Sequence, residues 1–220
     1  MRILLAGGGT GGHLYPALSL ARALSGAHAD PGLCSPFEQV PAGTALALDF
    51  DAVPEARPSV LVVTSRSDAG DRVTSEFDVP VAHVESRPIS RSSLRGAASG
   101  VIGNVRGTAA ALPIVARFAP DVVIGAGGYA SVPVVAATAM LRSGPLRRTR
   151  IAIMNPDVAP GLANRALATI ADEVWCAYAQ TEEHFPRKFV LTGTPVRPEF
   201  YALPPARDAR KRLGLDPDRA

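Results

Sequence analysis

Seven short apolar runs, rich in β-branched residues, recur along the 220-residue chain with stretches between them that can form helices. The runs are residues 3–6, 60–63, 79–84, 122–124, 151–153, 174–176 and 189–191. Apolar strands that alternate with helices are typical of a parallel sheet covered on both faces. Hydrophobic residues make up 47% of the chain and aromatic residues only 5%, which disfavours an aromatic-rich β sandwich. We predict one large α/β domain with a doubly wound, Rossmann-like sheet.

The first run leads into the most distinctive loop of the sequence, which spans Gly7 to His13 and contains five glycines. Helix-forming residues follow from Pro16, so the loop delivers a helix N-terminus, where free N–H groups and the helix dipole favour anions. We therefore predict a site for a phosphate or another oxyanion. The same dipole favours a neutral imidazole, which makes His13 a candidate proton acceptor, with simple helix capping as the alternative.

Two further polar or glycine-rich turns follow the fourth and fifth runs, at residues 125–131 and 154–164. Ligands of doubly wound sheets bind outside the carboxyl ends of the strands, where all three turns are expected. The pair Gly127 and Gly128 beside Tyr129 and Ser131 favours ligand contact, although a packing turn would use the same glycines.

Two motifs point to other functions. Gly7, Gly9 and Gly12 match G-x-G-x-x-G, and Arg66 after the second run would suit the phosphate of NADP, so an NADP-binding protein is one alternative. Asp49-Phe50-Asp51 resembles a metal-binding D-x-D motif, but it lies in an irregular insertion, residues 25–58, and we interpret it as coincidence. We expect no metal site.

Positive charge is unevenly distributed. No Asp or Glu occurs between Ser86 and Pro120, whereas arginines are frequent there and again at residues 142–150. Such a segment beside apolar residues indicates either an anionic membrane surface or polyanion, or a solvated helix face. The arginines are Arg87, Arg91, Arg95, Arg106 and Arg117, followed by Arg142, Arg147, Arg148 and Arg150.

Four stretches in this order and spacing resemble the N-terminal half of the MurG family of glycosyltransferases. They are residues 8–18, 120–131, 160–164 and 193–197. The resemblance implies a GT-B enzyme that transfers N-acetylglucosamine from UDP-GlcNAc to lipid I, giving lipid II for peptidoglycan. It further implies inverting catalysis without a metal or cofactor, peripheral attachment to an anionic membrane at its cytoplasmic face, and no nucleic-acid partner.

The resemblance also implies roles for individual residues. His13 would be the catalytic base. The cleft near UDP-GlcNAc would be lined by Thr10, Gly11, Gly12, Asp157 and Arg197. The lipid acceptor would contact Gly127, Gly128, Tyr129, Ser131 and Asn164. The membrane patch would comprise Arg87, Arg91, Arg95, Arg106, Arg142, Arg147 and Arg148.

The chain departs from the family pattern in ways that bear on activity. Residues 154–157 read Met-Asn-Pro-Asp where the family has His-Glu-Gln-Asn, and an ionised Asp157 would weaken pyrophosphate binding. We expect residues 1–193 to form the acceptor domain and residues 194–220 to be a linker and the start of a missing donor domain. The chain alone should then be inactive. A non-catalytic or split-subunit acceptor module is the alternative.

Overall fold

The computed structural model describes residues 1–8, 11–25, 58–65, 79–88, 94–197, 200 and 203–218. Its centre is one seven-stranded sheet in which all neighbouring strands are parallel, in the order β3-β2-β1-β4-β5-β6-β7. The strands are β1 (Arg2–Ala6), β2 (Ser59–Ser65), β3 (Val81–Val84), β4 (Val122–Gly125), β5 (Arg150–Asn155), β6 (Glu173–Cys176) and β7 (Phe189–Leu191). Each of the seven predicted runs forms one of these strands, which confirms the predicted α/β sheet.

The strand order reverses direction at the first strand. From β1 the chain moves outward to β2 and β3, then returns to place β4 on the other side of β1. The carboxyl ends of the neighbouring strands β1 and β4 therefore mark the topological switch point, where doubly wound sheets bind ligands.

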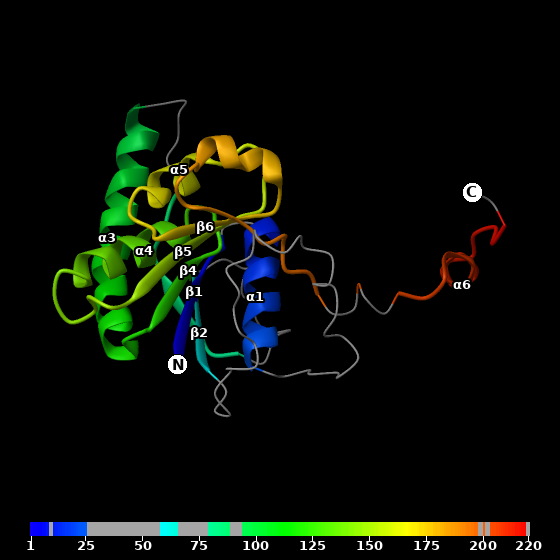
Figure 1. The fold of residues 1–220 in the computed structure, drawn as a ribbon, viewed down its shortest axis with the longest axis horizontal. Helices are drawn as coiled ribbons and strands as arrows, with labels where there is room; N and C mark the ends of the chain where they lie inside the picture. Colours follow the sequence, from blue (N-terminus) through cyan, green and yellow to red (C-terminus); the bar gives the residue numbers. More distant parts are fainter. Residues whose placement is uncertain are drawn as a thin grey trace.

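Helices cover both faces of the sheet (Figure 1). Helix α1 (Gly11–Ser25) packs on one face, where its Leu14 and Leu18 join Leu5 in one buried cluster. Helices α3 (Leu94–Phe118), α4 (Ser131–Leu141) and α5 (Leu162–Ala168) lie on the opposite side, where Leu4 belongs to a second cluster. Neighbouring residues of a strand point to opposite faces, so β1 contributes to both clusters.

A 3-10 helix, η3 (Ala179–His184), precedes β7, and α6 (Ala206–Arg212) lies near the C-terminus. Helix α1 begins at Gly11, earlier than predicted, so Pro16 lies inside it and His13 belongs to the helix. Residues 26–57 of the predicted insertion, Arg66 and the Asp49–Asp51 motif lie outside the described residues.

The half-buried carboxylate of Asp172, just before β6, binds residues at the start of β5 and at the end of α4. Asp172 accepts hydrogen bonds from the Ile151 N–H at 2.8 Å and from Arg142 Nη2 at 2.9 Å, and Arg150 Nε lies 3.6 Å away. Burial acts to raise the pKa of Asp172, but the Ile151 N–H and the two arginines outweigh it and hold the pKa below its ordinary value.

We expect Asp172→Asn to reduce the free energy of unfolding by about 1–2 kcal/mol at neutral pH. The folded-state pKa is lowered from 3.8, so this stabilisation is present above that pH and disappears as the pH falls through the folded value. Urea unfolding followed by circular dichroism at neutral and acidic pH measures it. The exposed Glu182, changed to Gln, is the control; an Asp172→Asn deficit that persisted undiminished in acid would contradict the assignment.

Candidate functional site

Two glycine-containing turns meet at the switch point between β1 and β4. The Gly7 N–H donates to Val63 O at 3.1 Å, and the Ala126 N–H donates to Ala6 O at 2.7 Å. The backbone after β1 and the backbone after β4 therefore both continue the sheet beyond the strand ends. Gly8 then adopts a φ of 138°, and a Cβ there would collide with the Thr64 hydroxyl. This backbone conformation is accessible to glycine and strained for other residues.

The imidazole of His13 lies between these two turns. Gly127 and Gly128 have φ values of 93° and 72°, and they bring their backbone against the histidine ring. A Cβ on Gly127 would lie 2.7 Å from His13 Nδ1. On Gly128 it would lie 3.0 Å from His13 Cδ2 and 2.6 Å from Gly8 O. Only residues without a side chain fit here, so the structure brings the two predicted glycines directly onto His13.

Two buried asparagines support this cluster from β5 and α5. Asn164 is 3% exposed and Asn155 is 1% exposed. Asn164 Nδ2 donates to Asn155 Oδ1 at 3.0 Å and to Met154 O at 3.2 Å. Asn164 was a predicted acceptor contact, whereas no role was predicted for Asn155. Its signal in the sequence is an amide at the carboxyl end of an otherwise apolar strand.

The other predicted acceptor residues belong to the turn itself. Ser131 is fully buried, and its hydroxyl donates to Gly128 O at 2.8 Å, which stabilises the turn beside His13. Tyr129 is half-buried, and its carbonyl accepts the Val132 N–H at 3.2 Å. Contact of either side chain with a ligand stays a prediction.

The predicted cleft residues lie in several places. Gly11 and Gly12 open α1 beside His13, whereas Thr10 lies outside the described residues. Asp157 is exposed, and its carbonyl, not its carboxylate, accepts a hydrogen bond from Asn155 Nδ2 at 2.5 Å. Arg197 packs its guanidinium over the Tyr15 ring, 5.1 Å from the centroid, so it attaches the segment after β7 to α1.

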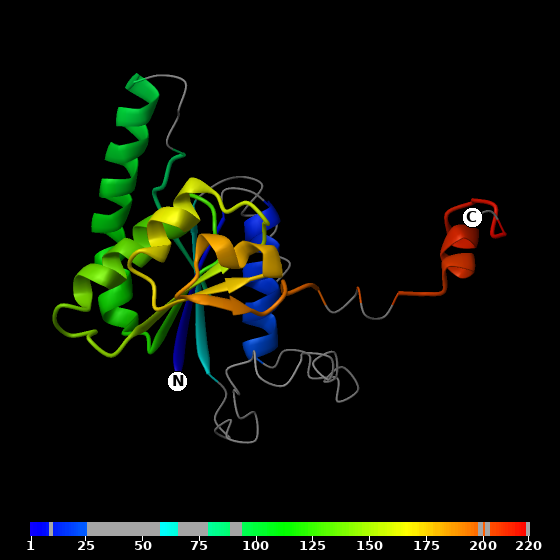
Figure 2. The same ribbon diagram turned by 45° about the horizontal axis from the view of Figure 1, so that its top comes forward.

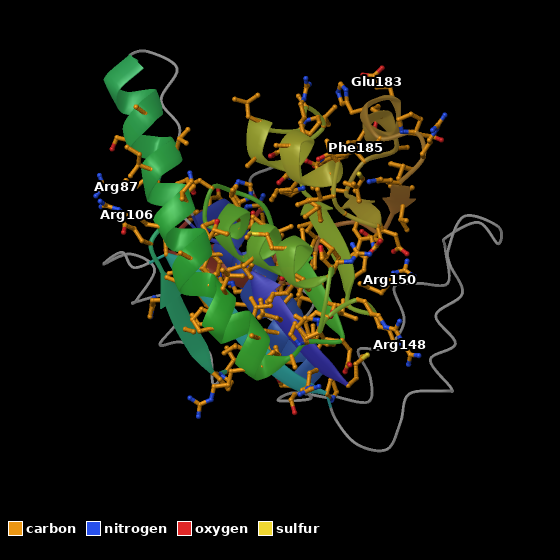
Figure 3. The ribbon with its side chains drawn as sticks, turned by 90° about the vertical axis from the view of Figure 1, so that its left-hand side faces the viewer. Arg87, Arg106, Arg148, Arg150, Glu183 and Phe185 are labelled. Atoms are coloured by element: carbon orange, nitrogen blue, oxygen red, sulfur yellow. The ribbon has the colours of Figure 1, made fainter. Side chains whose placement is uncertain are left out.

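The arginines predicted to form one membrane patch divide into separate groups. Arg87 lies against α3 near Arg106 of that helix, while Arg148 and Arg150 lie well away from both (Figure 3). Arg142 is half-buried and forms an ion pair with Asp172, so it stabilises the fold. Residues 142–150 lead into the amino end of β5, whereas Arg87 follows the carboxyl end of β3, so these arginines belong to opposite ends of the parallel strands. Arg91 and the side chain of Arg95 lie outside the described residues.

Within the described part of the chain, no group of three or more His, Cys, Asp or Glu residues could hold a metal ion. No helix found there is long and apolar enough to cross a membrane.

A doubly wound sheet with glycine turns at its β1/β4 switch point defines a Rossmann-like domain, a class that binds its ligands at this edge of the sheet. The chain belongs to glycosyltransferase family 28: residues 46–176 match the model described as the glycosyltransferase family 28 N-terminal domain. This match confirms the resemblance read from the sequence at the level of family, and it favours a glycosyltransferase over the NADP-binding alternative.

Curated relatives carry the name UDP-N-acetylglucosamine--N-acetylmuramyl-(pentapeptide) pyrophosphoryl-undecaprenol N-acetylglucosamine transferase. The protein from Desulforudis audaxviator is 35% identical over 223 residues, covering 100% of this chain and 50% of its own length. The protein from Moorella thermoacetica is 35% identical over 221 residues, covering 99% of this chain and 50% of its own length. The chain thus spans about half the length of the curated relatives it matches.

Solved structures show the same fold. MurG of Acinetobacter baumannii superimposes with a TM-score of 0.60 at 19% identity, covering 89% of this chain and 46% of that one. Anabaena Alr3699/HepE in complex with UDP-glucose gives a TM-score of 0.54 at 13% identity, covering 97% of this chain and 49% of that one. The fold is therefore that of the N-terminal half of GT-B transferases.

We expect Gly128→Ala to lower the free energy of unfolding by about 2–4 kcal/mol, because it combines left-handed strain with overpacking against Gly8 O and His13. Gly193 has a φ of 75° and an open Cβ position, so Gly193→Ala should cost only about 1 kcal/mol. Gly144→Ala, with neither strain nor contact, should be neutral within about 0.5 kcal/mol. Equal losses for Gly128→Ala and Gly193→Ala in chemical denaturation would contradict the contact with His13.

Proposed function

We propose that this chain is the acceptor-binding half of a glycosyltransferase that moves N-acetylglucosamine from UDP-GlcNAc to lipid I, forming lipid II. The observation that carries this proposal is the cluster of His13, Gly127 and Gly128 at the switch point of a family 28 fold. The names of the 35% identical relatives supply the donor and the acceptor. Residues 1–193 would bind the acceptor, and residues 194–220 would connect them to a donor-binding domain.

The chemistry needs a base on the acceptor side. As the acceptor 4-hydroxyl attacks the anomeric carbon, His13 takes its proton, the bond to UDP breaks, and the configuration at that carbon inverts. The N–H groups at the start of α1, where Gly11 and Gly12 lie, favour the negative charge of a pyrophosphate. The negative charge of Asp157, at the same end of the sheet, would repel a pyrophosphate, but Asp157 is exposed and water screens its charge.

The test combines this chain with the donor-binding half of a relative, fused after residue 220 or added in trans, and measures transfer from labelled UDP-GlcNAc to a lipid I analogue. We expect transfer with the wild-type chain and a loss of about 10²–10⁴-fold for His13→Ala. His184→Ala, at a half-buried histidine of η3, is the matched control. No transfer from a folded combination contradicts the proposal. A stable complex without transfer favours the non-catalytic module.

An apolar face of α3 supports membrane attachment. Val101, Ile102 and Val105 are 50%, 53% and 63% exposed, and the exposed Arg106 adjoins them in sequence. The N-terminal part of α3 extends beyond the sheet (Figure 2). We propose that this face docks on the anionic cytoplasmic leaflet, where each basic side chain contributes about 1 kcal/mol.

Cosedimentation with vesicles of anionic and neutral lipids tests this docking. Val105→Gln should weaken binding to anionic vesicles several-fold because it removes apolar contact area. Arg106→Gln should weaken it by about fivefold, the equivalent of about 1 kcal/mol. Met140→Gln and Arg148→Gln, at exposed residues outside α3, are the matched controls. Equal effects of the control and α3 substitutions would contradict the assigned face.

A further inference from the structure

The amide of Asn164 lies beside the same backbone position, Gly127, as Nδ1 of His13. We propose that Asn164 is a positioning residue that holds His13 in the tautomer protonated on Nδ1, so that Nε2 is the proton-accepting nitrogen. The catalytic meaning of this tautomer rests on the proposed function, but the tautomer itself is a property of the chain alone.

The orientation of both asparagine amides follows from their partners. Asn155 Nδ2 donates to Asp157 O, so Asn155 Oδ1 must face Asn164. Asn164 Nδ2 donates to that oxygen at 3.0 Å and to Met154 O at 3.2 Å. Turning the Asn164 amide over would place its oxygen against two acceptors, which is unfavourable in a buried site. Asn164 Oδ1 therefore points away from β5.

That oxygen and His13 Nδ1 are both buried, and neither has a hydrogen-bond partner among the described residues. Both lie beside one point, the position of a Cβ on Gly127, which is 2.7 Å from His13 Nδ1 and 3.5 Å from Asn164 Oδ1. Leaving a buried polar atom unsatisfied costs about 1–3 kcal/mol. A hydrogen bond from an N–H on Nδ1 to Asn164 Oδ1 would satisfy both atoms at once, because a carbonyl oxygen can only accept.

The consequence falls on the other ring nitrogen. A neutral imidazole protonated on Nδ1 has its lone pair on Nε2, which is the atom that can take a proton from a hydroxyl. The tautomer of a histidine is set by the hydrogen bond of its other nitrogen, and here that partner is an amide fixed by β5. Asn164 thus acts through His13, which differs from the acceptor contact that the resemblance implied for it.

Long-range ¹H–¹⁵N correlation spectra of the ¹⁵N-histidine-labelled chain, at about pH 8 where an ordinary imidazole is neutral, report the tautomer directly. His13→Gln assigns the His13 signals. We expect Nδ1 of His13 at the chemical shift of a protonated nitrogen and Nε2 at that of an unprotonated nitrogen. The reverse assignment in the wild-type chain overturns the proposal, whatever any variant does.

Asn164→Leu removes the acceptor and should move the Nε2 signal toward that of a protonated nitrogen. Asn104→Leu is the matched control: Asn104 is also a buried helical asparagine, 8% exposed, with Nδ2 donating to two carbonyls and Oδ1 unpartnered among the described residues. It should leave the His13 signals unchanged. An unshifted His13 in a folded Asn164→Leu chain would overturn the role of Asn164.

The two proposals fail separately. The expected tautomer without sugar transfer in the complemented enzyme removes the proposed function and leaves the positioning role intact. Transfer by a chain whose His13 carries its proton on Nε2 removes the positioning role alone.

Discussion

The packing of the His13 ring on the backbone of Gly127 and Gly128 is the contact on which the rest of the site depends. It joins the turn after β4 to the first turn of α1, and through Gly8 to the end of β1. A side chain at either glycine would occupy the space of the imidazole or of the Gly8 carbonyl. The two turns can therefore close on each other only where three backbone positions carry no Cβ and a flat ring lies between them.

This contact lies where the topology of the sheet leaves a crevice. Because β1 is paired with both β2 and β4, the connections diverge at its carboxyl end and leave α1 and the β4 turn facing each other. Asn155 of β5 and Asn164 of α5 form a hydrogen-bonded pair beside this contact. His13, the N-terminus of α1 and a buried amide pair are thereby brought together from α1, the turn after β4, β5 and α5.

The strands could be predicted from the sequence because burial on both faces demands apolar, β-branched runs, and the three turns could be placed because parallel strands end at one edge. The contacts between elements could not be predicted from the sequence. Nothing local shows that Arg142 pairs with Asp172, that Arg148 lies away from Arg87 and Arg106, or that Asn164 donates to Asn155. These follow from strand order and packing, which depend on residues far apart in the chain.

A nuclear Overhauser spectrum of the ¹³C,¹⁵N-labelled chain measures the central contact without any substrate or partner. We expect strong cross-peaks from the Hδ2 and Hε1 protons of His13 to the Hα protons of Gly127 and Gly128. A folded chain whose His13 ring protons show no cross-peak to either glycine would contradict it, since the ring would then lie outside the two turns.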